Sequence, residues 1–213
     1  MRIIAGSKRG MKLFSPEGMD TRPITDRVKE SVFDILYSKG YPAGCIVADL
    51  FCGTGSMGLE ALSRGAAWAT FFDKDYRVIE ILKRNIAKAD FAGQSKAVCA
   101  NVLKVGAAPT PEHGLYDLVF VDPPYAMSEN CEADSRIGKL MFLISQQVKD
   151  DGLVILRTHE QALAQEHYDK LTQVDMRSWG NMTVRFYCKN DSEKSSPDDK
   201  DSSDAASNAE QAD

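Results

Sequence analysis

Apolar residues follow two alternating patterns along the middle of the chain. Short apolar runs are typical of buried strands, whereas apolar residues that recur every three or four positions are typical of amphipathic helices. Strands are predicted at 46–51, 67–72, 97–100, 118–121 and 153–156, and helices between them at 56–64, 75–89 and 134–149. Strands that alternate with helices favour a parallel sheet covered on both faces.

The first part of the chain departs from this alternation. Short extended runs at 2–4 and 11–14 are separated by a glycine-bracketed turn, which predicts an N-terminal β-hairpin. A helix follows, with Thr25 as its N-cap and Gly40 beyond its end. We therefore expect residues 1–24 to form a hairpin and arm that precede the main domain.

The last part of the pattern is also different. Two extended runs flank Gly180-Asn181, a dipeptide that favours a two-residue hairpin turn. We expect an α/β Rossmann-like domain over residues 25–189, with a mostly parallel seven-stranded sheet that ends in an antiparallel hairpin.

The composition indicates a third segment at the C-terminal end of the sequence. The 213 residues are 43% hydrophobic and 27% charged, which is ordinary for a globular chain, and the net charge is −5. Residues 191–213 contain eight acidic and two basic residues, so residues 1–190 carry a net charge of about +1. Few residues in this segment could form a core, and residues 190–213 are predicted to be a disordered acidic tail.

Several classes of protein fit the sequence poorly. No run approaches the roughly 20 apolar residues of a membrane span, and the first residues lack the apolar stretch of a signal peptide. The five cysteines form no C-x-x-C pair and no metal-ligand spacing with the three histidines. We expect a cytoplasmic protein with no disulfide framework and no metal site.

The first chemical signal is a glycine-rich turn after the strand at 46–51. Gly53, Gly55 and Gly58 match the spacing G-x-G-x-x-G, and the helix that follows offers free N–H groups to an anion. Asp73 lies 20 residues beyond Gly53, where a carboxylate can accept hydrogen bonds from both ribose hydroxyls. The pattern predicts a nucleoside-bearing cofactor, for which NAD and S-adenosylmethionine both remain open.

The second signal is Asp122-Pro123-Pro124-Tyr125, directly after the strand at 118–121. The prolines stiffen the segment and donate no N–H, so hydrogen-bond acceptors dominate it. Asp122 adds a carboxylate and Tyr125 an aromatic ring. An acceptor-rich site with a stacking ring suits a planar group that carries an NH₂, and a nicotinamide oxidoreductase gives no reason for such a loop.

Asp122–Tyr125 resembles the motif of S-adenosylmethionine-dependent amino methyltransferases. Taken with three further stretches, the chain resembles the RsmD family, which methylates the exocyclic N2 of a guanine in small-subunit ribosomal RNA. The stretches are 2–6, 22–30 and 49–66. Ile24 stands where the family usually has threonine, and Asp73 where it more often has glutamate. The resemblance implies a methyltransferase that acts on 16S rRNA or the small ribosomal subunit, and we expect the protein to be a monomer.

The resemblance also implies roles for individual residues. Asp122, Pro123 and Tyr125 would form the catalytic loop. The S-adenosylmethionine site would comprise Asp49, Phe51, Gly53, Gly55, Asp73, Asn101 and Val102. Asn101 has a simpler alternative role as a helix cap. Adenine N6 and glutamine N5 remain rival acceptors, because each presents an NH₂ on a planar group.

Basic residues near the N-terminus are candidates for RNA contact. Lysine and arginine bind phosphates without reading the base sequence. The candidates are Lys8, Arg9, Lys12, Arg22 and Arg27. Arg22 and Arg27 could instead pair with Asp26 or Glu30 on the predicted helix.

Overall fold

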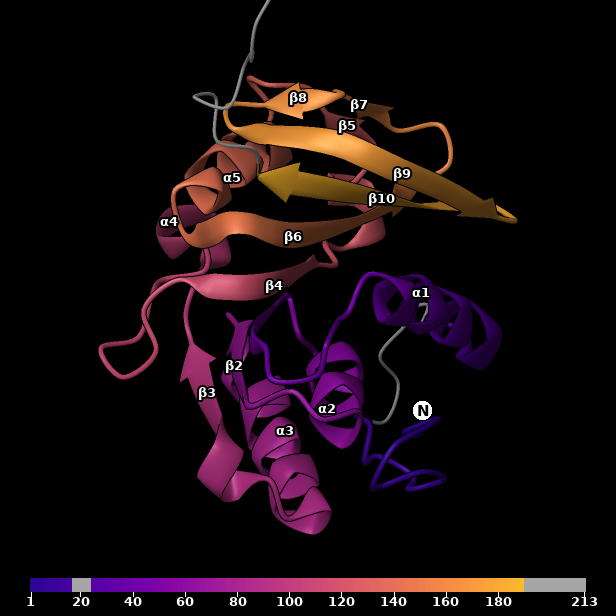
Figure 1. Cartoon of the computed structure of the whole chain (residues 1–213), viewed down its shortest axis with the longest axis vertical. Coiled ribbons are helices and arrows are strands. Elements are labelled where there is room, and N and C mark those ends of the chain that lie inside the picture. The colour runs from indigo at the N-terminus through magenta and orange to yellow at the C-terminus, as the bar shows by residue number, and fades with distance from the viewer. Residues whose placement is uncertain (17–23, 190–213) are drawn as a thin grey trace, which may run out of the picture.

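The structure, a computed structural model, describes residues 1–16 and 24–189. Within these residues the main sheet has eight strands in the order β3-β2-β1-β4-β6-β10-β9-β8 (Figure 1). Its strands are β1 (Ile46–Leu50), β2 (Trp68–Asp73), β3 (Ser95–Cys99), β4 (Tyr116–Val121), β6 (Val148–His159), β8 (His167–Tyr168), β9 (Leu171–Trp179) and β10 (Met182–Lys189). Arg22 and the proposed tail at 190–213 lie outside the described residues.

The sheet combines a parallel part and an antiparallel part. Strands β3, β2, β1, β4 and β6 pair in parallel, whereas β10 runs antiparallel to both β6 and β9. A separate small sheet pairs β5 (Asn130–Cys131) with β7 (Leu163–Ala164). The predicted Rossmann-like architecture with a closing antiparallel hairpin is confirmed, and β8 adds one short strand to the expected seven.

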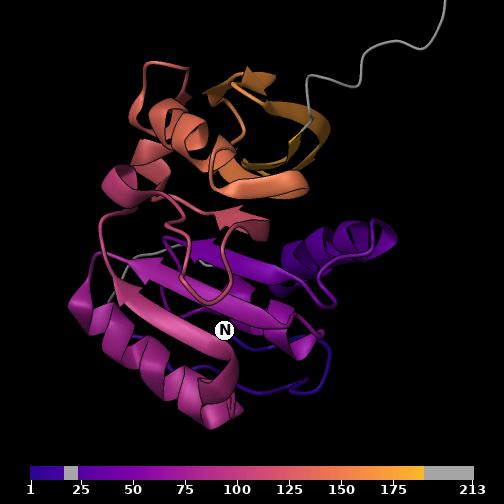
Figure 2. The same ribbon diagram turned by 60° about the vertical axis from the view of Figure 1, so that its left-hand side comes forward.

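Alternating residues of the central strands face two separate hydrophobic clusters. Val47, Phe71 and Phe120 pack under α1 (Asp26–Ser38), α2 (Ser56–Ser63) and α3 (Tyr76–Ala89). The opposite face carries Leu50, Val119 and Val121, which pack against α5 (Arg136–Ser145) and the short α4 (Val102–Val105). In Figure 2, α4 and α5 lie side by side and away from α1. The period-2 pattern of the strands thus places one helical layer on each face.

Two predicted elements differ from the structure. The N-terminal hairpin has a single bridge, between Arg2 and Lys12, in place of two strands. Ile3 still bonds to the opposite run: its N–H donates to the Met11 carbonyl, and its carbonyl accepts from the Gly10 N–H. The helix predicted at 134–149 ends at Ser145, because Val148 begins β6 and pairs with Tyr116. Two 3₁₀ turns, Ala92–Gln94 and Tyr125–Met127, complete the described elements.

The described part of the chain contains no helix with the length and apolar character of a membrane span. All five cysteines are free thiols, and no group of three or more potential metal ligands occurs within residues 1–16 and 24–189.

Gly58 is expected to tolerate no side chain. A Cβ at this position would lie 2.3 Å from Cε1 of Phe71, inside the contact between α2 and β2. Gly58→Ala should therefore lower the free energy of unfolding by about 1–3 kcal/mol, the usual cost of overpacking. Urea denaturation would measure this, with Gly93→Ala as a control, since a Cβ there meets nothing within 4 Å.

Candidate active site

The glycine-rich turn leaves the end of β1 in an unusual conformation. Phe51, Gly53 and Gly55 have φ values of 56°, 55° and 88°, in the left-handed region that favours glycine. A Cβ on Gly53 would meet nothing within 4 Å, whereas one on Gly55 would lie 2.5 Å from Leu82. The turn therefore presents one open side at Gly53 and packs its other side on α3. Phe51 is partly buried against the α5 side of the sheet.

Two predicted carboxylates hold this turn in place. Asp73 accepts hydrogen bonds from the Gly53 N–H at 3.1 Å and from the Asp75 N–H at 3.0 Å. Asp49 is buried and accepts a bond from the Gly58 N–H at 2.8 Å. Burial raises the pKa of Asp49 well above its usual value, and the nearby Asp122 and Asp73 carboxylates add to this effect. A cation bound close by would relieve this cost.

The Asp122–Tyr125 loop lies next to the glycine turn. Strands β1 and β4 are neighbours, with Leu50 paired to Val121, and the Asp122 N–H donates to the Leu50 carbonyl at 3.4 Å. In open α/β sheets, ligands bind at the carboxyl ends of the strands where the strand order reverses, and here that point lies between β1 and β4. The structure therefore brings the two sequence motifs to one sheet edge.

Asp122 forms an ion pair with Arg157 from the end of β6. Burial raises the pKa of Asp122, and the Arg157 guanidinium opposes that rise. These two side chains border a cavity whose other walls are apolar: Ile24, Val32, Met57, Phe120, Val121, Ile155 and Val184. Arg157 was not predicted as a site residue, although its position directly after the predicted strand at 153–156 placed it at the same sheet edge.

The rest of the loop is also fixed. The Tyr125 hydroxyl donates to the Asn181 carbonyl at 2.8 Å, and its ring meets His159 edge-to-face with centroids 5.2 Å apart. Pro123 is buried, and within the described residues no group donates a hydrogen bond to its carbonyl. His159 and Asn181 were not predicted to belong to the site. Both come from the C-terminal elements that frame the loop.

Two predicted cofactor residues have structural roles here. Asn101 caps α4, with its side-chain oxygen accepting from the Leu103 N–H at 3.1 Å. Asn101 therefore has the helix-cap role that was predicted as its alternative. Val102 is only 3% exposed and packs in the cluster beneath α5, so its side chain offers almost no surface to a ligand.

Comparison with known proteins identifies the family. A family model described as "Conserved hypothetical protein 95" matches residues 1–188. "Putative rRNA methyltransferase YlbH" of Bacillus subtilis is 30% identical over 191 residues, spanning 89% of this chain and 99% of that protein. "Ribosomal RNA small subunit methyltransferase D" of Escherichia coli K12 is 42% identical over 125 residues, which span 59% of this chain and 60% of that protein. The chain belongs to the RsmD family of S-adenosylmethionine-dependent methyltransferases.

A solved structure of similar shape agrees with this assignment. "Putative methyltransferase yhhF from Escherichia coli" has a TM-score of 0.74 and 28% identity, and the match covers 89% of this chain and 98% of that one. An RNA methyltransferase from Salinibacter ruber in complex with S-adenosyl-L-homocysteine shares the fold at 12% identity, with a TM-score of 0.58.

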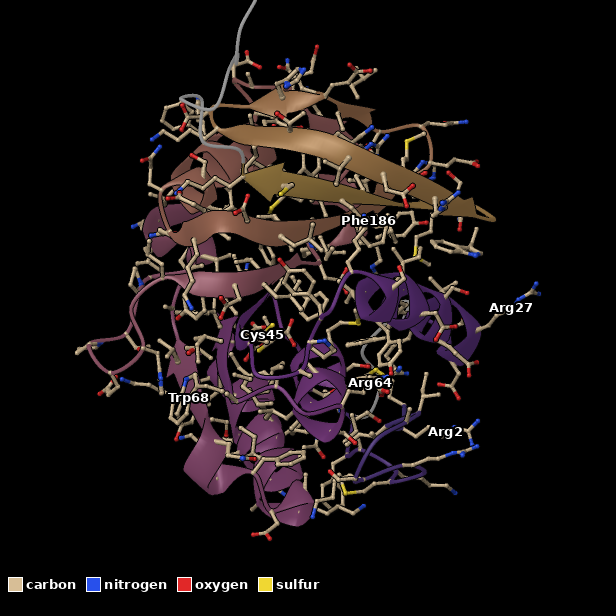
Figure 3. All side chains as sticks on the ribbon, viewed as in Figure 1. Arg2, Arg27, Cys45, Arg64, Trp68 and Phe186 are labelled. Atoms are coloured by element: carbon tan, nitrogen blue, oxygen red, sulfur yellow. The ribbon has the colours of Figure 1, made fainter. Side chains whose placement is uncertain are left out.

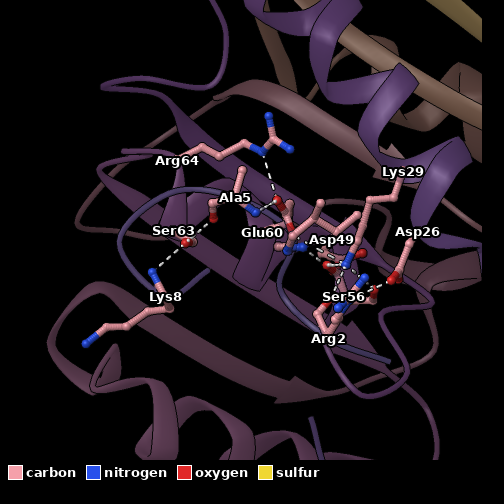
Figure 4. A network of polar contacts seen from close by, with 12 residues as sticks. Arg2, Ala5, Lys8, Asp26, Lys29, Asp49, Ser56, Glu60, Ser63 and Arg64 are labelled. Carbon is pink, nitrogen blue, oxygen red and sulfur yellow. Dashed lines mark hydrogen bonds and ion pairs between the residues drawn. The ribbon is translucent and has the colours of Figure 1, made fainter. Parts of the chain in front are cut away.

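In this RsmD-family chain, a buried ionic network joins the N-terminal hairpin to α2, the helix that follows the glycine turn (Figure 4). The Glu60 carboxylate accepts from the Ile4 and Ala5 N–H groups at 2.7 and 3.0 Å, and it pairs with Arg64 at 2.8 Å. Lys29, 1% exposed, lies 3.4 Å from Glu60 and donates to the Ser56 hydroxyl at 3.1 Å. Burial lowers the pKa of Lys29, while Glu60 opposes the shift.

Most of the described RNA-contact candidates lie on the surface. Arg9, Lys12 and Arg27 are exposed, whereas Lys8 is half-buried, with its ammonium 5.7 Å from the centre of the Phe91 ring. Asp26 pairs with Arg2 at 2.7 Å instead of with Arg27. Figure 3 shows Arg2 and Arg27 extending from the same side of the molecule.

Proposed function

We propose that the protein transfers a methyl group from S-adenosylmethionine to the exocyclic N2 of a specific guanine in the 16S rRNA of the small ribosomal subunit. The observation that carries the proposal is the Asp122 N–H to Leu50 carbonyl contact, which joins the acceptor loop to the glycine turn. A nucleoside-bearing methyl donor and a planar amine could therefore share one site. Because a single chain supplies both parts, the proposed active species is the monomer.

The residues of the turn fit the cofactor. Gly53 has an open side, and the Thr54 hydroxyl is buried without a hydrogen-bond partner among the described residues. The methionine part would lie against Gly53 and Gly55, and the buried Asp49 would favour its ammonium group. Asp73 would hold the ribose, and Phe51 would offer an apolar surface to the adenine. When bound, the group supplies a methyl attached to a positively charged sulfur.

The loop residues suit the acceptor nitrogen. The lone pair of guanine N2 is delocalised into the ring, so this nitrogen is a weak nucleophile. Hydrogen bonds from its N–H groups to the Asp122 carboxylate and the Pro123 carbonyl would favour a pyramidal nitrogen and stabilise the positive charge that develops on it. Alignment of the two reactants contributes further, up to roughly 7–11 kcal/mol. The N–H proton becomes acidic once the nitrogen is alkylated, so no strong base is required beforehand.

The surroundings of Asp122 offer both apolar and charged contacts. Apolar side chains line the small cavity beside it, together with Asp122 and Arg157. Tyr125 is already fixed through Asn181 and His159, so stacking of a base on its ring would cost little side-chain entropy. Lys8, Arg9, Lys12 and Arg27 would contact phosphates of the RNA. The relatives named as ribosomal RNA methyltransferases support an RNA substrate.

Methyl transfer to natural RNA tests this proposal. The protein would be incubated with tritiated S-adenosylmethionine and with ribosomal RNA or small subunits from cells that lack it, and the RNA would then be digested to nucleosides. We expect the label in N2-methylguanosine from small-subunit RNA. Label in N6-methyladenosine, or label in glutamine of the ribosomal proteins in place of the RNA, would assign one of the rival amines and contradict the proposal. Thermal stabilisation by NAD and not by S-adenosylhomocysteine would contradict the cofactor.

The pH dependence of the rate should depend on Arg157. Asp122 accepts hydrogen bonds as a carboxylate, so activity is lost when the pH falls through its pKa. Arg157 lowers the pKa of Asp122 against the effect of burial. Arg157→Met should therefore move the acidic limb of the kcat profile to higher pH, whereas Arg157→Lys should keep it close to wild type. Superimposable limbs for the Arg157→Met variant and the wild-type enzyme would show that this ion pair does not set the titration of Asp122.

A further inference from the structure

An exposed aromatic ring lies between the N-terminal hairpin and α3. Phe14 is 40% exposed although two cations from α3 lie over its ring. The Arg84 guanidinium is 4.5 Å from the ring centre, and the Lys88 ammonium is 4.7 Å from it. We refer to Lys12, Phe14, Arg84 and Lys88 as the hairpin–helix surface.

Hydrogen bonds fix this surface in place. Asn85, buried within α3, accepts from the Phe14 N–H at 2.7 Å and donates to the Phe14 carbonyl at 3.0 Å. The Lys88 ammonium donates to the Lys12 carbonyl at 2.6 Å. These bonds hold the backbone of Phe14 and the ammonium of Lys88 in place, so the hairpin and α3 form one continuous surface.

The same asparagine connects this surface to the glycine turn. Its amide nitrogen also donates to the Thr54 carbonyl at 3.0 Å, within the turn between Gly53 and Gly55. The hairpin–helix surface is thus anchored, through a buried side chain, to the α3 side of the glycine turn.

The cations of this surface have no acidic partner within residues 1–16 and 24–189. Among the described residues, no carboxylate lies within 4.0 Å of the side-chain nitrogens of Lys12, Arg84 or Lys88, nor of those of the neighbouring Lys8 and Arg9. Lys83 on the same helix, in contrast, pairs with Glu80 at 2.7 Å. Unpaired cations around an exposed aromatic ring match the chemistry of single-stranded nucleic acid, in which phosphates alternate with bases that can stack.

We propose that the hairpin–helix surface binds a single-stranded segment of the RNA substrate. Lys12, Arg84 and Lys88 contact phosphates, and a base stacks on Phe14. The proposal rests on the proposed function for the identity of the substrate, and it extends RNA contact from the hairpin to α3.

Binding of a labelled single-stranded RNA over a range of salt concentrations tests the phosphate contacts. The probes are an oligouridylate and deproteinised 16S rRNA. Each phosphate contact to a single strand adds about 0.7 to the slope of log K against log salt. Arg84→Ala with Lys88→Ala should therefore reduce the slope by about 1.4. Lys83→Ala, the matched control on the same helix, should leave the slope unchanged.

Stacking has a different signature. Phe14→Ala and Phe14→Leu should weaken RNA binding by about five- to 150-fold, while the salt slope stays unchanged. Phe14→Tyr should restore the affinity, since its ring can stack. Thermal melting and S-adenosylhomocysteine binding should match wild type in every variant, which separates RNA contact from folding and from the cofactor site.

Two results would overturn the inference. The first is a wild-type salt slope in the protein that carries both Arg84→Ala and Lys88→Ala. The second is wild-type affinity in both Phe14→Ala and Phe14→Leu proteins. Either result could occur while N2-methylguanosine still forms at saturating RNA, in which case the proposed function stands without this surface. Failure to form that nucleoside, with the binding changes observed, would overturn the proposed function and leave an RNA-binding surface.

Discussion

Replacement of Asp122 by asparagine is expected to reduce kcat for methyl transfer by about 10²–10³-fold, the usual effect of removing one preorganised group that stabilises transition-state charge. Asparagine keeps the shape of the side chain, but its amide oxygen carries no charge. Its NH₂ group is a hydrogen-bond donor, and it would face the N–H groups of the nitrogen that accepts the methyl, which are donors as well. Single-turnover methyl transfer with saturating RNA would measure the chemical step directly.

Controls separate chemistry from folding in this experiment. Asp122 and Arg157 form an ion pair, so Asp122→Asn leaves a guanidinium without its partner. The double variant Asp122→Asn, Arg157→Met removes that charge and should be equally inactive but no less stable than the single variant. S-adenosylhomocysteine should bind to both. A rate within threefold of wild type for Asp122→Asn would contradict the role assigned to this carboxylate.

The largest loss of stability is expected from Glu60→Leu. Glu60 is fully buried. Its carboxylate accepts hydrogen bonds from two backbone N–H groups and pairs with the side chains of Lys29 and Arg64. Removal of the carboxylate leaves the Lys29 ammonium, 1% exposed, without a counter-charge. Loss of one partner from a buried ion pair costs about 3–5 kcal/mol, and we expect the free energy of unfolding to fall by this amount in urea denaturation.

Two further variants test the reason for this loss. Lys29→Met combined with Glu60→Leu removes both buried charges, so the double variant should be more stable than Glu60→Leu alone. Glu80→Gln breaks the exposed pair with Lys83 and should change stability by less than about 0.5 kcal/mol. If Glu60→Leu costs as little as Glu80→Gln, the network does not hold the hairpin against α2.

Local patterns were sufficient to predict the parallel half of the sheet. Strands β1 and β4 are apolar over most of their length, and α3 repeats its apolar residues with a helical period, so neither depends on distant information. The end of α5 was misplaced because Val148 continues the apolar spacing of the helix, yet it pairs with Tyr116. The two-residue strands β5, β7 and β8 exist only through contacts with other segments, which no local pattern contains.

The candidate site was predictable to the same extent. Glycine spacing and the proline pair are local signals, and both motifs follow strands, so their meeting at one sheet edge followed from the parallel order. Glu60 and Asn85 could not be assigned in this way. Their partners, Ile4 and Phe14, are 56 and 71 residues away in the sequence. Asn101 was predicted either to bind the cofactor or to cap a helix, and its contact with Leu103 shows the cap.

The central claim is that the glycine turn and the Asp122–Tyr125 loop form one site for donor and acceptor. A crystal structure of the protein with S-adenosylhomocysteine tests it most directly. We predict that the ribose lies at Asp73, the amino-acid part at Gly53, and the sulfur on the side of the molecule that carries Asp122 and Pro123. A cofactor bound elsewhere, or a sulfur separated from Asp122 by packed side chains, would contradict the claim.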